Sequence, residues 1–119
     1  MFYMETCEYM TVVETKRFIA DASNSMTDDE RTEFIQFIAQ NPTKGDLIEG
    51  TGGVRKVRWA RGARGKSGGV RIIYYYHNPT IPIFLLTLYR KNQKATISPA
   101  EKKLMKQLVR QIVDTYSAQ

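Results

Sequence analysis

The chain has 119 residues, of which 42% are hydrophobic and 25% are charged, a balance typical of one globular domain. It contains one histidine and one cysteine, which excludes an internal disulfide and a metal site rich in either residue, and argues against a Ser-His-Asp triad. No run of about 18 apolar residues suggests a membrane span, and the first residues do not resemble a secretory signal. We therefore expect a single domain over residues 1–119, with a peripheral segment at 1–9, in the cytoplasm and without a metal or other cofactor.

The basic residues are concentrated in the middle of the chain, which has a formal net charge of +6. No acidic residue occurs between Glu49 and Glu101. Repulsion makes such clustering unfavourable unless an anion offsets it, so the middle segment favours a polyanionic partner. The alternative for a charge run is a solvated basic face without a partner. The lysines and arginines of this interval are Arg55, Lys56, Arg58, Arg61, Arg64, Lys66, Arg71, Arg90, Lys91 and Lys94.

The N-terminal part of the chain predicts at least one helix. Residues 11–18 have a mixed pattern that we interpret as an edge strand, and residues 19–25 are ambiguous between a helical turn and a loop. Thr27 and Glu30 have the spacing of a capping box at a helix start, and the Asn-Pro pair at 41–42 ends this helix. Its apolar face comprises Phe34, Phe37 and Ile38.

The middle of the chain predicts three strands joined by short connections, which form an antiparallel meander. The first strand alternates, so that Lys56 and Arg58 lie on one face while Val57 and Trp59 lie on the other. The last strand is the most apolar and is expected to be central, with Pro82 at its start. The strands span residues 54–60, 70–76 and 81–89, and the connections around them span residues 45–53, 62–69 and 77–80.

A second capping box predicts a C-terminal helix. Ser98 and Glu101 have the required spacing, Pro99 occupies the first helical position, and the helical pattern continues to about Tyr116. The whole pattern indicates an α+β fold, in which helices pack against one curved antiparallel sheet. The apolar stripe expected to face that sheet comprises Leu104, Met105, Leu108, Ile112 and Val113.

Three segments of the sequence together resemble the RelE/ParE toxin superfamily, and most closely its HigB-type branch. They are GTGGVRKVR, GKSGGVRIIYYY and LLTLYRKN, in this order, followed by the C-terminal helix. The resemblance extends over most of residues 11–116, and its specific motifs lie within residues 50–92. It implies a RelE-like fold and the toxin of a type II toxin–antitoxin system, a ribosome-dependent mRNA endonuclease that inhibits translation. It also implies binding to the ribosome and to mRNA, and an inhibiting antitoxin of the helix-turn-helix, HigA-like kind that links the toxin indirectly to operator DNA.

Metal-independent RNA cleavage requires a proton acceptor for the 2′-hydroxyl, cations at the phosphate and a proton donor for the leaving oxygen. Arginine is a permanent cation, and lysine can accept a proton when neighbouring cations or burial lower its pKa. Matched to the family motifs, Lys56 is interpreted as the proton acceptor, with Arg58 lowering its pKa. Arg71 and Lys91 are interpreted as the cations that stabilise the phosphate. The alternative for all four is an ordinary surface cation.

The proton donor is not assigned by the resemblance. Some RelE-type toxins have a catalytic tyrosine after the last strand, but residues 92–98 contain none. Tyr75 and Tyr89 are possible substitutes because strand alternation places each on the cationic face of its strand, although they can equally pack or stack on bases. We assign His77 no role. The expected contacts to RNA and the ribosome are Arg55, Arg61, Arg64, Lys66, Arg90 and Lys94.

Two other functions remain open at this point. A ParE-like poison of DNA gyrase would have the same fold and would not need the cationic residues for RNA cleavage. A non-catalytic RNA- or DNA-binding module would also use a basic strand face with nearby tyrosines. The presence of Lys56, Arg58, Arg71 and Lys91 together favours the nuclease.

Overall fold

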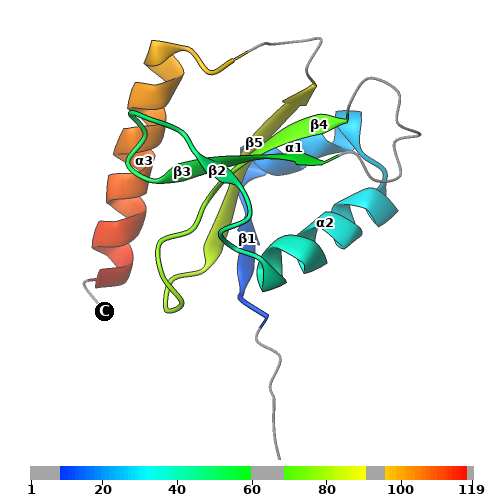
Figure 1. Cartoon of the computed structure of the whole chain (residues 1–119), viewed down its shortest axis with the longest axis horizontal. Helices are drawn as coiled ribbons and strands as arrows, with labels where there is room; N and C mark the ends of the chain where they lie inside the picture. Colours follow the sequence, from blue (N-terminus) through cyan, green and yellow to red (C-terminus); the bar gives the residue numbers. More distant parts are fainter. Residues whose placement is uncertain (1–8, 60–68, 91–95, 118–119) are drawn as a thin grey trace, which may run out of the picture.

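A computed structural model describes residues 9–59, 69–90 and 96–117 and shows a sheet with helices on both faces (Figure 1). The strand order is β1-β5-β4-β3-β2. The three central strands are consecutive and antiparallel, which confirms the predicted meander. The bounds are β1 (Val12–Glu14), β2 (Asp46–Leu47), β3 (Val54–Trp59), β4 (Val70–Tyr75) and β5 (Ile83–Arg90).

The expectation of a wholly antiparallel sheet is wrong at one edge. β1 pairs in parallel with β5, with Val12 opposite Ile83, so the sheet is mixed. A parallel pair needs a long crossover connection, and here two helices and the rest of the sheet separate the two strands in sequence. The expected edge strand at 11–18 is also shorter than predicted, because α1 (Lys16–Ser25) begins where Thr15 accepts a hydrogen bond from the Phe18 N–H.

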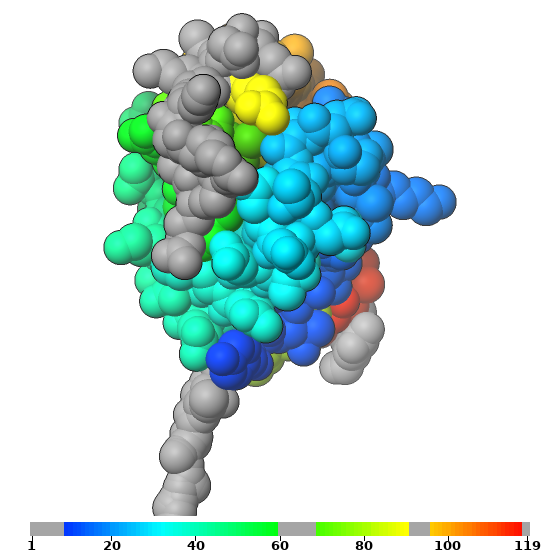
Figure 2. Space-filling model, turned by 90° about the vertical axis from the view of Figure 1, so that its right-hand side faces the viewer, coloured from blue at the N-terminus to red at the C-terminus, as the bar shows by residue number. Residues whose placement is uncertain are grey.

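The helices α1 and α2 (Asp28–Gln40) cover one face of the sheet. The predicted capping box is confirmed: the Glu30 N–H donates to Thr27 Oγ1 at 3.1 Å, and the Thr27 N–H donates to Glu30 Oε1 at 2.8 Å. Figure 2 shows α1 and α2, in blue and cyan, as one continuous layer of side chains. The core beneath them includes Phe18, Phe34, Ile38, Trp59, Ile72, Tyr74, Ile83 and Leu85.

The opposite face of the sheet packs against α3 (Pro99–Ser117). The second capping box is confirmed, since the Ser98 N–H donates to Glu101 Oε1 at 2.8 Å and the Glu101 N–H to Ser98 Oγ at 3.1 Å. This core includes Val54, Ile73, Tyr75, Ile81, Leu86, Tyr89, Ile97, Val109 and Ile112. None of the helices in the described ranges is both long enough and apolar enough to cross a membrane.

The predicted apolar stripe of α3 is only partly buried. Ile112 lies in the core as expected, but Leu104 and Leu108 remain 64% and 37% exposed. The buried side of the helix is centred on Val109 and Ile112, which the hydrophobic periodicity alone does not specify. The two leucines consequently lie on the flank of the helix.

Tyr74 fixes the connection that leads into β2. Its side chain is fully buried, and its hydroxyl accepts from the Gly45 N–H at 2.8 Å and donates to the Pro42 carbonyl at 2.9 Å. A Cβ on Gly45 would lie 2.9 Å from the Tyr74 hydroxyl, so the backbone approaches closely because residue 45 is glycine.

We expect Tyr74→Phe to lower the free energy of unfolding by about 1–3 kcal/mol, because the Gly45 N–H loses its acceptor. Burial raises the pKa of Tyr74 above its ordinary value of 10.0, so the folded state disfavours the phenolate. The stabilising contribution of the Tyr74 hydroxyl is therefore complete below about pH 10 and is lost as the pH rises through the raised pKa of Tyr74. Urea denaturation of both proteins at pH 7 and at alkaline pH measures this. Equal stabilities at pH 7 would contradict the assignment.

Candidate nucleic-acid interface

The alternation of β3 separates its basic side chains from its aromatic one. Val54 belongs to the core on the α3 side, and Trp59 belongs to the core under α1 and α2. Because successive strand residues point to opposite faces, Lys56 and Arg58 share the face of Val54. Trp59 packs against Phe34 and Phe37 of α2, each with its ring centroid 5.2 Å away, so it lies on the face opposite Lys56 and Arg58, as predicted.

A second arginine lies directly across from Arg58. The β3–β4 register pairs Arg58 with Arg71, and the β4–β5 register pairs Arg71 with Tyr89. Neighbouring strands lie about 4.8 Å apart, so these side chains form a row across three strands. Lys56 is two residues earlier on β3, opposite Ile73. We call the surface formed by Lys56, Arg58 and Arg71 the cationic face.

The cationic face concentrates like charges on a part of the sheet away from α3. Arg58 is exposed, and Lys56 and Arg71 are half-buried. Figure 1 shows α3 crossing the sheet near the start of β3, whereas Arg58 lies at the other end of that strand. Like charges directly opposite each other on a sheet disfavour the folded state. An anion bound between Arg58 and Arg71 would offset that repulsion.

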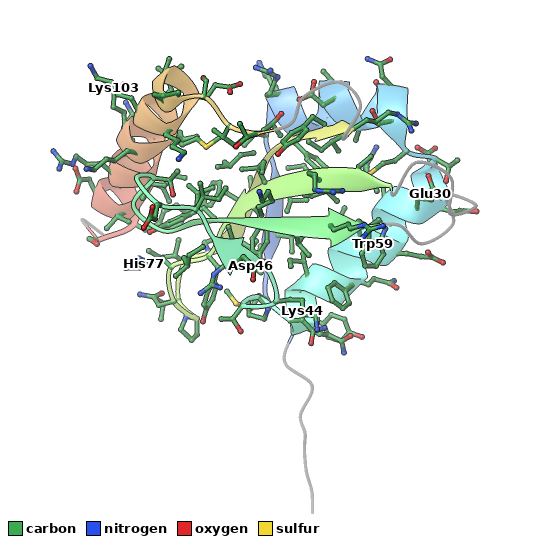
Figure 3. All side chains as sticks on the ribbon, turned by 45° about the horizontal axis from the view of Figure 1, so that its top comes forward. Glu30, Lys44, Asp46, Trp59, His77 and Lys103 are labelled. Carbon is green, nitrogen blue, oxygen red and sulfur yellow. The ribbon has the colours of Figure 1, made fainter. Side chains whose placement is uncertain are left out.

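A carboxylate also borders the cationic face, which the sequence did not predict. β2 pairs with β3 so that Asp46 lies opposite Lys56. Figure 3 shows Asp46 at β2, beside β3. Asp46 precedes the acid-free interval, which begins after Glu49, and the two-residue strand lies inside a segment expected to be a connection. No local pattern in the sequence therefore predicted the pairing of β2 with β3.

Two residues expected to contact RNA, Arg55 and Arg90, form hydrogen bonds within the protein. Arg55 lies on the face opposite Lys56, and its Nη1 donates to the carbonyl oxygens of Gly45 at 2.7 Å and Thr43 at 3.3 Å. Arg90 directs its Nη2 to the Ser25 carbonyl at 3.4 Å, at the end of α1. Neither side chain joins the cationic face. The other expected residues, Lys91, Arg61, Arg64, Lys66 and Lys94, lie outside the described residues.

The two candidate tyrosines have different neighbours. Tyr75 is 2% exposed, pairs with Val54, and shares a hydrogen bond of 2.9 Å between its hydroxyl and His77 Nδ1. Burial raises the pKa of Tyr75. Tyr89 is 8% exposed and is the register partner of Arg71. Only Tyr89 therefore lies in the row of the two arginines, and His77 serves as the partner of Tyr75.

The architecture and the cationic face agree with a match to a known family. A family model described as the RelE toxin of the RelE / RelB toxin-antitoxin system matches residues 10–119. The match begins just before β1 and includes α3, so it covers both cores and the cationic face. The chain therefore belongs to the RelE toxin family.

Proposed function

We propose that this toxin is a ribosome-dependent, metal-independent mRNA endonuclease of the HigB-type branch. The observation that supports this activity best is the row of Arg58, Arg71 and Tyr89 across three strands, with Lys56 on the same face. Such a surface combines permanent cations for a phosphate with groups that can exchange a proton. It matches the needs of a reaction in which the RNA supplies its own nucleophile.

In the proposed reaction, the 2′-oxygen attacks the adjacent phosphorus while the bond from phosphorus to the 5′-oxygen breaks. Lys56 accepts the proton of the 2′-hydroxyl, and Arg58 lies two residues away on the same face of β3. Arg71 binds the non-bridging oxygens, whose charge increases in the transition state. The products are a 2′,3′-cyclic phosphate and a 5′-hydroxyl.

The remaining roles complete the proposal. Tyr89 is next to Arg71 in the register and is the tyrosine best positioned to supply a proton to the leaving oxygen. Lys91 is the second cation at the phosphate. Arg61, Arg64, Lys66 and Lys94 contact ribosomal RNA phosphates, which position the protein without reading sequence. The partners are cytoplasmic ribosomes and a HigA-like antitoxin that also binds operator DNA.

The order of events after expression of the chain without its antitoxin tests this function. We expect translation to stop first, with mRNA cut in the coding region and no early DNA damage. When Arg71→Ala is expressed in the same way, we expect translation to continue and the mRNA to remain intact. Early DNA damage with intact mRNA would instead identify a gyrase poison, and the absence of both effects would favour a non-catalytic binding module.

A further inference from the structure

A groove of about 510 Å³ continues the row of Arg58, Arg71 and Tyr89 past β5. It lies between α1, β5 and α3, and Tyr89 is one of its lining residues. β1 ends at Glu14 whereas β5 continues to Arg90, so β1 does not border the end of β5. The volume of the groove is within the range of about 300–1,000 Å³ that is typical of small-ligand sites. The row of polar side chains therefore leads into a hollow that can hold a ligand.

A bulge in β5 shapes the wall of the groove. Leu85 and Thr87 pair with consecutive residues of β4, so the register of these two strands leaves Leu86 unpaired. Thr15, the N-cap of α1, directs its hydroxyl to the carbonyl oxygens of Leu85 at 2.8 Å and Leu86 at 3.2 Å. Bulges redirect side chains next to functional sites. Here Leu86 and Thr87, which are consecutive, both line the groove.

The polar groups of the groove favour an uncharged ligand that has hydrogen-bond donors. Asp21 accepts from Arg17 Nε at 3.0 Å and from Thr87 Oγ1 at 2.6 Å, both through Oδ2. Among the described residues Oδ1 has no such partner, and the side chain is 27% exposed, so Oδ1 can accept from a ligand. Glu101 is a further carboxylate of the wall. Carboxylates repel a phosphate, so the groove suits an uncharged base better than the RNA backbone.

The proposed chemistry gives the RNA a direction across the sheet. Lys56 takes the proton of the 2′-hydroxyl, which belongs to the nucleotide on the 5′ side of the cut. Arg71 binds the phosphate, and Tyr89, its register partner, supplies a proton to the leaving 5′-oxygen. That oxygen belongs to the nucleotide on the 3′ side of the cut. This nucleotide therefore lies at Tyr89, the residue that the row and the groove share.

We propose that the groove binds the base of the nucleotide on the 3′ side of the cut and favours a base with an exocyclic amino group. This inference rests on the proposed nuclease and adds a specificity to it. Adenine, cytosine and guanine each have an amino group that can donate to Asp21 Oδ1. Uracil instead has two carbonyl oxygens beside its one ring N–H, and these repel the carboxylate. Leu104 and Leu108, which are 64% and 37% exposed, supply apolar surface against which the base packs.

The test measures single-turnover cleavage on ribosomes programmed with mRNAs that differ only in the nucleotide on the 3′ side of the cut. We expect wild type to cut the adenine mRNA at least about tenfold faster than the uracil mRNA, because uracil leaves Oδ1 without a donor from an amino group. Asp21→Asn should reduce this ratio below about threefold, since an amide nitrogen in place of Oδ1 donates and does not accept. The matched control is Asp114→Asn, which removes an exposed carboxylate of α3 outside the groove and should keep the wild-type ratio.

A second variant fills the groove without changing Asp21. Leu108→Trp enlarges a side chain of the rim, so we expect it to slow cleavage of every mRNA by about tenfold through displacement of the base. Leu47→Trp is its control, because Leu47 is 62% exposed but lies on β2, outside the groove. The control should retain the wild-type rates. Urea denaturation of each variant shows whether it remains folded.

A binding measurement separates this inference from the proposed nuclease. Adenosine 5′-monophosphate and uridine 5′-monophosphate are titrated into the full-length toxin, and the backbone amide shifts are followed by NMR. The adenine nucleotide should shift the amides of residues 86–89 and 104–108, and the uracil nucleotide should shift them less. If wild type cuts no mRNA but these shifts occur, the nuclease fails and the base subsite stands.

Two results would overturn the base subsite. One is a toxin that cuts mRNA at rates independent of the nucleotide on the 3′ side of the cut, or a folded Asp21→Asn that keeps the wild-type ratio. The other is a toxin that cuts no mRNA and whose groove amides do not shift with adenosine 5′-monophosphate.

Discussion

Replacing Arg71 with alanine is expected to slow mRNA cleavage on ribosomes by about 100- to 1,000-fold. This is the usual effect of removing one group that stabilises negative charge developing on oxygen in the transition state. Arg71 is half-buried and lies in the middle of the row, between Arg58 and Tyr89. Arg71 lies opposite Arg58, and cations directly opposite each other on a sheet disfavour the folded state. The variant should therefore remain folded.

The measurement for Arg71→Ala is a single-turnover cleavage rate on programmed ribosomes, together with urea denaturation. Arg110→Ala is a matched control because Arg110 is an exposed arginine on α3, distant in sequence from the cationic face. The control should retain the wild-type rate. Full activity of Arg71→Ala, or equal losses in both variants, would remove Arg71 from the proposed site.

Replacing Lys56 with arginine is expected to slow cleavage by at least about 100-fold, within the range attributed to a general base. Arginine keeps the positive charge and a similar reach, but it does not release its proton in proteins. Lys56→Arg should therefore be nearly as slow as Lys56→Ala. The comparison separates proton transfer from simple phosphate binding, which arginine would perform as well as lysine.

Single-turnover rates of Lys56→Arg and Lys56→Ala, measured across the pH range, give the result. If Lys56→Arg retains most of the wild-type rate while Lys56→Ala loses it, Lys56 is a phosphate contact and another group accepts the proton. Asp46 would then be the alternative to test, because it lies opposite Lys56 in the register.

The elements with strong local signals were predicted well. Both capping boxes, the turn before β5 and the position of Pro82 ahead of that strand agree with the structure. The segment at 11–25 was less clear: residues 11–18 were expected to form an edge strand and residues 19–25 a helical turn or a loop, whereas α1 begins at Lys16. The parallel pairing of β1 with β5 depends on residues about 70 positions apart in the sequence, so no local pattern predicts it.

The site was predicted in part. Alternation alone placed Lys56 and Arg58 on one face, as the structure confirms. The alignment of Arg58 with Arg71 depends on the register between two strands, which the sequence does not specify. For the same reason Asp46 was missed, and Arg55, one residue from Lys56, was grouped with side chains on the opposite face. The exposure of Leu104 likewise depends on how α3 is rotated on the sheet.

The chemical nature of the cut ends tests the central claim most directly. Purified toxin is added to ribosomes programmed with a defined mRNA, and the termini of the fragments are identified by mass spectrometry and enzymatic end-labelling. If the 2′-hydroxyl attacks the adjacent phosphate while the RNA is bound at the cationic face, the fragments have 2′,3′-cyclic phosphate and 5′-hydroxyl ends. Arg71→Ala should produce no such fragments. Intact mRNA, or fragments with 5′-phosphate ends from attack by water, would contradict it.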